Sequence, residues 1–111
     1  MKVCRGDIFF VTGNKKSYGS EQKQDRPAVV VSNDMANKHS TVVEVVFLTS
    51  AEKTKDLPTH VEVKCQIMSI ALCEQVNSVS KDRLDRYIRS CTEKEMKAID
   101  EALMISLGLK D

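Results

Sequence analysis

The sequence has no tryptophan, and aromatic residues make up only 5% of its 111 residues. So few rings limit any role in which flat bases stack on aromatic side chains. The chain also contains no internal repeat, no low-complexity tract and no apolar run near the 18 or so residues of a membrane-spanning helix. These absences exclude a repeat array and a membrane-spanning helix. The length predicts a single domain over residues 1–111.

Neither sign of charge is in excess, because 17 lysines and arginines face 16 aspartates and glutamates. The resulting net charge of +1 and pI of about 7.6 argue against a protein that coats nucleic acid through a broad basic surface. A small positive groove remains compatible with this balance. The first residues include Gly6 and Asp7 where a signal peptide needs an apolar stretch, so we expect a cytoplasmic protein with no membrane association.

The four cysteines follow neither CxxC spacing nor a Cys/His ligand pattern. Without an export signal, we expect reduced, partly buried thiols and no metal site, with a disulfide or a zinc site as the minor alternative. Cys73 ends an apolar run that starts at Ile70, which favours a core residue over a nucleophile.

Alternation and β-propensity predict strands at 7–12, 27–32, 41–49, 59–64 and 69–76. The strand at 41–49 is nearly continuous in apolar residues, which indicates burial on both faces and a central position. A helical turn over 80–86, a short strand at 87–89 and a helix over 93–107 complete the prediction. Thr92 and Glu95 have the spacing of a capping box, and Met96, Ile99, Leu103 and Leu107 recur at helical spacing.

This order of elements predicts a mainly β fold with a C-terminal helix. We expect a small, mostly antiparallel β-barrel or half-open sheet with the helix packed against it.

A polar stretch leads directly into a strand of valines at residues 19–34, with Arg26 at the junction. Pro27 disfavours helix for the residue before it, so Arg26 is expected in an extended conformation at the mouth of the strand. An arginine fork on a rigid strand end suits a phosphate or a carboxylate group. The alternative is a local ion pair with Asp25 or Glu21.

Four segments, in this order and spacing, carry a resemblance: RGDIFF at 5–10, GSEQKQDRPAVVVSND at 19–34, VVFLTS at 45–50 and SIALCEQVNSVSKDRL at 69–84. The terminal helix DEALMISLGL at 100–109 fits the same pattern. Together they resemble the MazF/PemK family of toxins from bacterial toxin–antitoxin systems. The resemblance implies a compact SH3-like barrel that forms a homodimer. It also implies sequence-specific, metal-independent and cofactor-free cleavage of single-stranded mRNA, with a cognate antitoxin peptide that blocks the groove.

The same resemblance assigns roles residue by residue. Arg26 matches the catalytic arginine, and Thr49 matches the hydroxyl residue that works with it. The remaining positions are substrate-binding: Ser20, Glu21 and Gln22 in a mobile loop over the groove, and Ser50, Glu74, Gln75 and Asn77 along it. Tyr18 is the one aromatic residue of the loop sequence and therefore an expected RNA contact.

Two departures qualify the resemblance. Many relatives carry an arginine–threonine pair where this chain has Asn77 and Ser78, which affects base recognition. Some relatives carry an arginine where this chain has Leu72, so a site built on an arginine–aspartate pair is disfavoured and Arg26 with Thr49 is preferred.

Metal-free RNA cleavage uses the ribose 2′-hydroxyl as nucleophile, so DNA is excluded as a substrate. Charge builds on the phosphate oxygens in the transition state, and Arg26 can supply two parallel donors to them. Arginine stays protonated, which leaves the general base open, with Glu21 as one candidate. For His39 and His60 we favour a surface or structural role.

A toxin of the same fold that poisons DNA gyrase is the alternative function, although the end of the terminal helix lacks the aromatic residue expected for it. A cleavage-deficient member that only binds RNA or an antitoxin is a further alternative.

Overall fold

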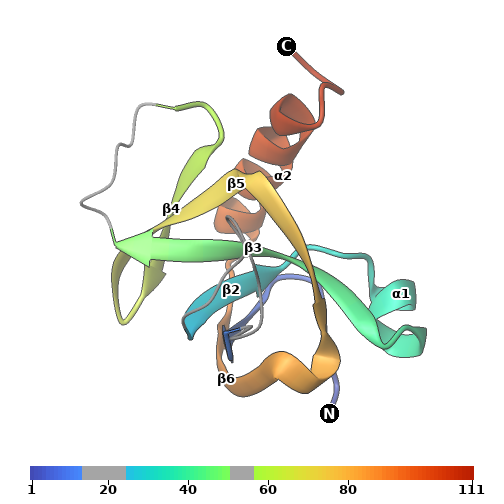
Figure 1. Cartoon of the computed structure of the whole chain (residues 1–111). Coiled ribbons are helices and arrows are strands. Elements are labelled where there is room, and N and C mark those ends of the chain that lie inside the picture. Colours follow the sequence, from blue (N-terminus) through green and yellow to red (C-terminus); the bar gives the residue numbers. More distant parts are fainter. Residues whose placement is uncertain (14–24, 51–56) are drawn as a thin grey trace.

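The computed structural model of the chain describes residues 1–13, 25–50 and 57–111 (Figure 1). Its strands are β1 (Asp7–Val11), β2 (Arg26–Val30), β3 (Val42–Ser50), β4 (His60–Cys65), β5 (Ile67–Ser80) and β6 (Leu84–Ser90). Its helices are α1 (Asp34–His39), the single 3₁₀ turn η1 (Lys81–Arg83) and α2 (Glu93–Ser106). No helix in the described ranges has the length and apolar character needed to cross a membrane.

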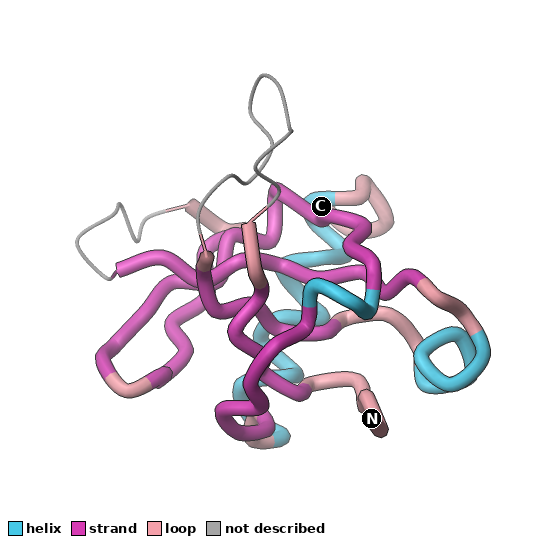
Figure 2. The backbone as a smooth tube through the Cα atoms, turned by 60° about the horizontal axis from the view of Figure 1, so that its bottom comes forward, coloured by secondary structure: helices cyan, strands magenta, loops and turns pink. Residues whose placement is uncertain are grey.

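The six strands form one antiparallel sheet in the order β4-β5-β3-β2-β1-β6. β3 lies inside this sheet and is buried on both faces, as its continuous apolar sequence predicted. Val45 and Phe47 join one core cluster, while Val46 and Leu48 join the other. The strands bend round rather than lying in a flat layer (Figure 2), and the predicted class of a mainly β, barrel-like fold with a C-terminal helix is confirmed.

Helix α2 packs on the cluster that contains Val46 and Leu48. The predicted capping box is present: the Thr92 side chain accepts from the Glu95 backbone, and the Glu95 side chain accepts from the Thr92 backbone. Ile99 is fully buried, but Leu107 is 62% exposed, so the predicted apolar face extends one turn further than the buried contact. Gly108, with φ of +75°, ends the helix in the left-handed conformation.

Strand β5 is longer than predicted and turns a corner (Figure 1). It pairs with β3 on both sides of the corner, through Ala71 with Leu48 and through Val76 with Val46. Between these two pairs, the single residue Phe47 of β3 lies opposite four residues of β5, 72–75. Such an irregularity bends a strand and redirects its side chains. It places Glu74 and Gln75 within β5 at its bend, rather than at the end of a strand.

The outer strands β4 and β6 are bridged by side chains instead of a backbone ladder. Arg89 of β6 donates from Nε to the Lys64 carbonyl oxygen at 2.7 Å, and Glu95 accepts from the Lys64 backbone N–H at 3.3 Å. The Arg89–Glu95 ion pair, at 2.7 Å, joins these two contacts. The two edge strands of the sheet are thus not paired by backbone hydrogen bonds, but side-chain contacts connect them.

All four cysteines are free thiols. Cys73 is fully buried, as its apolar surroundings predicted, and burial raises the pKa of its thiol to about 12. A thiol that stays protonated at neutral pH is a poor nucleophile, which supports the core role.

Candidate active site

Arg26 and Thr49 come together at neighbouring strand ends. Arg26 begins β2, where Pro27 favours the extended backbone, and Thr49 lies one residue before the end of β3. Ala28 pairs with Phe47, and continuing this antiparallel register by two residues on each strand brings Arg26 opposite Thr49. Both residues are half-buried, and both border the same two cavities.

The first of these cavities, the Glu74 cavity, has a volume of about 490 Å³. The described residues that line it come from β2, β3, β4, the segment before β4 and the corner of β5: Arg26, Thr49, Leu57, His60, Leu72, Glu74 and Gln75. The corner of β5 is what turns the acid and the amide toward Arg26 and Thr49.

Glu74 is held by two side chains of the neighbouring strand region. Its carboxylate accepts from Thr59 Oγ1 at 3.0 Å and lies 3.0 Å from His60 Nε2. The His60 side chain is only 7% exposed, against 34% for Glu74. Partial burial raises the pKa of the Glu74 carboxyl, but hydrogen bonds from His60, its own backbone and Thr59 outweigh this effect, so its pKa is lowered overall. Glu74 is therefore a carboxylate acceptor at neutral pH.

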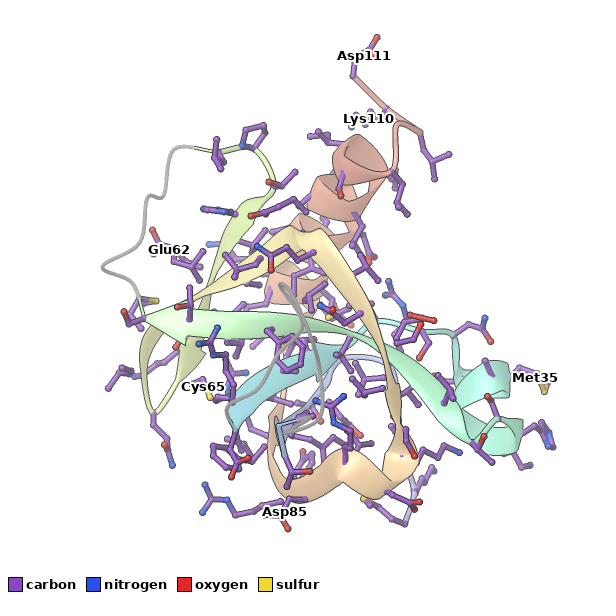
Figure 3. The ribbon with its side chains drawn as sticks, viewed as in Figure 1. Met35, Glu62, Cys65, Asp85, Lys110 and Asp111 are labelled. Carbon is purple, nitrogen blue, oxygen red and sulfur yellow. The ribbon has the colours of Figure 1, made fainter. Side chains whose placement is uncertain are left out.

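The second cavity, the Gln66 cavity, has a volume of about 340 Å³. Arg26, Thr49 and the turn between β4 and β5 form its walls, and the described lining residues are Arg26, Pro27, Leu48, Thr49, Ser50, Cys65, Gln66, Ile67 and Ser69. Cys65, labelled in Figure 3, ends β4 at this turn. Because Cys65 pairs with Ile67, Gln66 alone connects the two strands, with φ of +63°.

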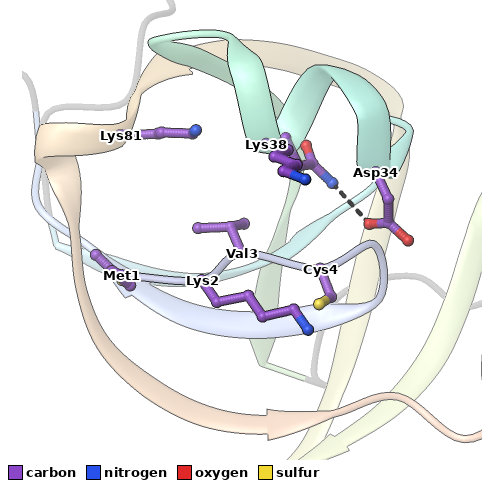
Figure 4. Close-up of a pocket in the computed structure, with 8 residues that line it drawn as sticks. Met1, Lys2, Val3, Cys4, Asp34, Lys38 and Lys81 are labelled. Carbon is purple, nitrogen blue, oxygen red and sulfur yellow. Dashed lines mark hydrogen bonds between the residues drawn. The ribbon is translucent and has the colours of Figure 1, made fainter.

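A larger cavity, of about 610 Å³, lies between the N-terminal segment, α1 and η1 (Figure 4). Lys2, Lys38 and Lys81 contribute to its lining, and Asp34 accepts there from Asn37 at 3.2 Å. None of the described residues that line it was assigned to the site from the sequence. Size alone therefore does not select the candidate site, which we choose by the chemistry of Arg26 and Thr49.

The structure brings together five of the residues predicted from the sequence: Arg26, Thr49, Ser50, Glu74 and Gln75. Asn77 is not among the described residues lining either cavity, and its side chain donates to the Gln75 carbonyl oxygen at 3.0 Å. The other four predicted positions, Tyr18, Ser20, Glu21 and Gln22, lie outside the described residues.

His60 lines this site although the sequence assigned it no part in RNA binding or catalysis. The predicted surface or structural role stays a prediction, and the structure adds that His60 lines the Glu74 cavity and contacts Glu74. The cause is the register of β4 on β5, in which His60 pairs with Leu72, two residues before Glu74. The sequence shows a histidine at the start of a strand with alternating polar and apolar residues. This pattern does not reveal which strand pairs with it, so it could not place His60 beside Glu74.

Chemically, the arrangement is a half-buried guanidinium and a hydroxyl shared by two cavities. A guanidinium fork suits a phosphate, and the hydroxyl can donate to a phosphate oxygen or accept from a neighbouring group. A phosphate bound by Arg26 and Thr49 would have one cavity on each side, which fits a phosphodiester inside a chain better than a terminal phosphate.

Known proteins resemble this chain in sequence and in fold. Residues 4–107 match the family model described as PemK-like, MazF-like toxin of type II toxin–antitoxin system. The chain is 37% identical to Endoribonuclease EndoA of Bacillus subtilis (strain 168) over 116 residues, covering 100% of this chain and 99% of that protein.

Two solved structures are similar over nearly their whole length. One is an endoribonuclease in complex with its cognate antitoxin from a mycobacterial species, with 27% identity, a TM-score of 0.80 and 98% of each chain covered. The other is MazF (Form-I) from Deinococcus radiodurans, with 19% identity, a TM-score of 0.81, and 97% of this chain and 98% of that chain covered. The second likeness shows the fold, and the family match covers most of the chain. The chain therefore belongs to the PemK-like, MazF-like toxins of type II toxin–antitoxin systems.

Proposed function

We propose that this toxin is a sequence-specific, metal-independent endoribonuclease that cleaves single-stranded mRNA, and that a cognate antitoxin peptide inhibits it. The relative from Bacillus subtilis is named an endoribonuclease, and a solved relative is described in complex with its antitoxin. The observation that carries the proposal is the shared position of Arg26 and Thr49 between two cavities. Since the proposed substrate is mRNA, we place the protein in the cytoplasm.

In this proposal the ribose 2′-hydroxyl attacks the adjacent phosphorus and the 5′-oxygen leaves. Arg26 stabilises the charge that develops on the phosphate oxygens, and its fork can contact two of them. Thr49 binds a phosphate oxygen or orients the 2′-hydroxyl. No step requires a metal ion, because the nucleophile is part of the substrate and the guanidinium supplies the positive charge.

The other residues of the site are assigned to substrate binding. Glu74, a carboxylate at neutral pH, accepts from amino or hydroxyl groups of the RNA, and Gln75 and Ser50 can both donate and accept. Tyr18, Ser20, Glu21 and Gln22 keep their assignment to RNA binding, with Glu21 as a candidate base. Asn77 contributes through the Gln75 backbone that it contacts.

The experiment compares the wild type with Arg26→Ala and Arg26→Lys on a mixed-sequence RNA in EDTA, with the 5′ ends of the fragments sequenced. We expect discrete cuts by the wild type and a rate about 10²–10³-fold lower for Arg26→Ala, as for the loss of one main transition-state donor. Arg26→Lys should recover only part of the rate, because an ammonium lacks the planar fork.

Arg86→Ala is the matched control, because Arg86 is an exposed arginine of β6 that is not among the described residues lining either cavity. Its guanidinium lies over the ring of Phe10 on β1. Arg86→Ala should cut like the wild type. Full activity of purified Arg26→Ala would contradict the role of Arg26. Loss of cleavage in EDTA would contradict metal independence. Cleavage of a substrate that carries 2′-deoxyribose at the cut would contradict attack by the 2′-hydroxyl.

A further inference from the structure

The two cavities that meet at Arg26 and Thr49 differ in chemistry. The Glu74 cavity contains a carboxylate, an imidazole and an amide. In the part of the Gln66 cavity that the structure describes, the amide of Gln66 and the hydroxyls of Ser50 and Ser69 accompany Arg26 and Thr49, with no acidic residue. Both volumes, about 490 and 340 Å³, fall within the range of roughly 300–1,000 Å³ typical of pockets for small molecules.

We propose that each cavity receives one of the two nucleotides that flank the scissile phosphate, and that the β4–β5 turn, through Gln66 and Ile67, selects the base in the Gln66 cavity. This inference rests on the proposed function, since it assigns the specificity of the same site. Gln66 and Ile67 belong to none of the segments that carried the family resemblance, and no role was assigned to them from the sequence.

The backbone of the turn holds Gln66 in place. Cys65 pairs with Ile67 and Lys64 pairs with Met68, so the two strands are in register up to the single connecting residue. Gln66 has φ of +63°, a left-handed conformation that non-glycine residues seldom adopt. Because the backbone of Gln66 is fixed by this short connection, its side chain has fewer positions open to it before binding. It therefore loses less entropy when it binds a base.

The side chains of the turn suit the recognition of an unpaired base. RNA-binding proteins read splayed-out bases through hydrogen bonds to their edges and apolar contacts with their faces. The Gln66 amide offers both a donor and an acceptor for an edge. Ile67 is 64% exposed at the border of the cavity, so its apolar surface is available to cover the face of a base.

The opposite cavity has a different preference. The Glu74 carboxylate accepts hydrogen bonds and favours a base that presents an amino group. The Gln66 amide carries a donor and an acceptor side by side, so it favours a base whose edge offers the complementary acceptor and donor. The geometry therefore predicts that the two flanking positions are selected by separate residues on opposite sides of Arg26.

The test measures relative cleavage rates in EDTA for a set of short RNAs that vary only at the two positions flanking the cut. The variants are Gln66→Gly, Ile67→Ala and Gln75→Ala. Glycine tolerates the positive φ, so Gln66→Gly removes the amide without adding backbone strain. Gln66→Asn, which retains an amide and tolerates the same conformation, serves as the rescue variant.

Met68→Ala is the matched control. Met68 is a 45% exposed apolar residue of β5 beside the turn, but it is not among the described residues that line the Gln66 cavity. It should leave the preference at both positions unchanged.

We expect Gln66→Gly and Ile67→Ala to change the ratio of rates between bases by about three- to tenfold at one flanking position only, as for the loss of one hydrogen bond or contact. Gln75→Ala should change the ratio at the other position, and Gln66→Asn should restore part of the wild-type ratio. If the turn variants keep the wild-type ratios, or shift the same position as Gln75→Ala, while the wild type cuts RNA, this inference is wrong and the proposed function stands. If the wild type cuts no RNA, both fail together.

Discussion

Thr49 differs from the other hydroxyl residues of the site because it borders both cavities, whereas Ser50 borders only the Gln66 cavity among the described residues. Replacing Thr49 with valine removes the hydroxyl and preserves the shape of the side chain. We expect Thr49→Val to lower the cleavage rate by about 10–100-fold, because a phosphate oxygen or the 2′-hydroxyl loses one fixed partner in the transition state. Single-turnover cleavage at saturating protein concentration measures this effect on the chemical step.

Thr49→Ser is the control for this prediction, because it keeps the hydroxyl and should retain most of the activity. Thr49 is half-buried at a strand end, so neither variant should unfold the protein, which circular dichroism can verify. Equal rates for Thr49→Val and the wild type would remove Thr49 from the mechanism.

Arg26 and Thr49 were predictable from the sequence for different reasons. Arg26 precedes a proline and a buried strand, which is a local pattern, whereas Thr49 was identified through the family resemblance. The position of His60 was not predictable, because its proximity to Glu74 depends on the pairing of β4 with β5. The position of Gln66 was not predictable either, because its left-handed conformation follows from a one-residue connection that only the register defines.

At the scale of elements, the central strand and the final helix were the most predictable. β3 is nearly continuous in apolar residues, and α2 carries a capping box and a buried face. The edge strand β6 was predicted too short, at 87–89 instead of Leu84–Ser90. Four of its seven residues are exposed, and its apolar residues do not alternate regularly with polar ones. Its contact with β1 decides its length, and this contact is not local in sequence.

The bridge between β6, α2 and β4 gives a prediction on stability. Hydrogen bonds from Arg89, partly opposed by burial, lower the pKa of Glu95 to about 2. A carboxyl whose pKa is lower in the folded state stabilises that state above its unfolded pKa of about 4.3 and loses this effect as the pH falls toward 2. We expect Glu95→Gln to lower the free energy of unfolding at pH 7 by about 2 kcal/mol, a figure reduced for the partial exposure of the pair.

The pH dependence separates this ion pair from a general effect of helix charge. The difference in unfolding free energy between wild type and Glu95→Gln, measured by urea denaturation, should fall to less than half between pH 7 and pH 3. Glu93→Gln is the control, because Glu93 lies in the same first turn of α2, is exposed and makes no side-chain hydrogen bond to another described residue. If the difference in unfolding free energy between the wild type and Glu95→Gln stays constant from pH 7 to pH 3, the charge of the Glu95 carboxylate does not stabilise the fold.

At the scale of the whole molecule, the barrel leaves apolar side chains exposed beside the end of α2. A groove of about 340 Å³ runs between α2, β3 and β5, and Val76, Met104, Leu107 and Leu109, which are 38–75% exposed, contribute to it. A contiguous apolar surface of this kind favours association. It provides a physical reason for the homodimer that the family resemblance implies, and it lies on a face that the β5 corner helps to form.

The homodimer predicts the behaviour of a single substitution at this groove. Leu107 is 62% exposed, so Leu107→Glu should leave the fold intact, but it places a charge where association would exclude water. We expect the wild type to be dimeric at micromolar concentration in sedimentation equilibrium, and Leu107→Glu to raise the dissociation constant of the dimer at least about 10-fold. Met35→Glu, at a 71% exposed methionine on α1, should leave it unchanged. A monomeric wild type would contradict the dimer itself. An unchanged dissociation constant for Leu107→Glu would place the interface on another face, because a charge buried in an apolar contact cannot be without cost.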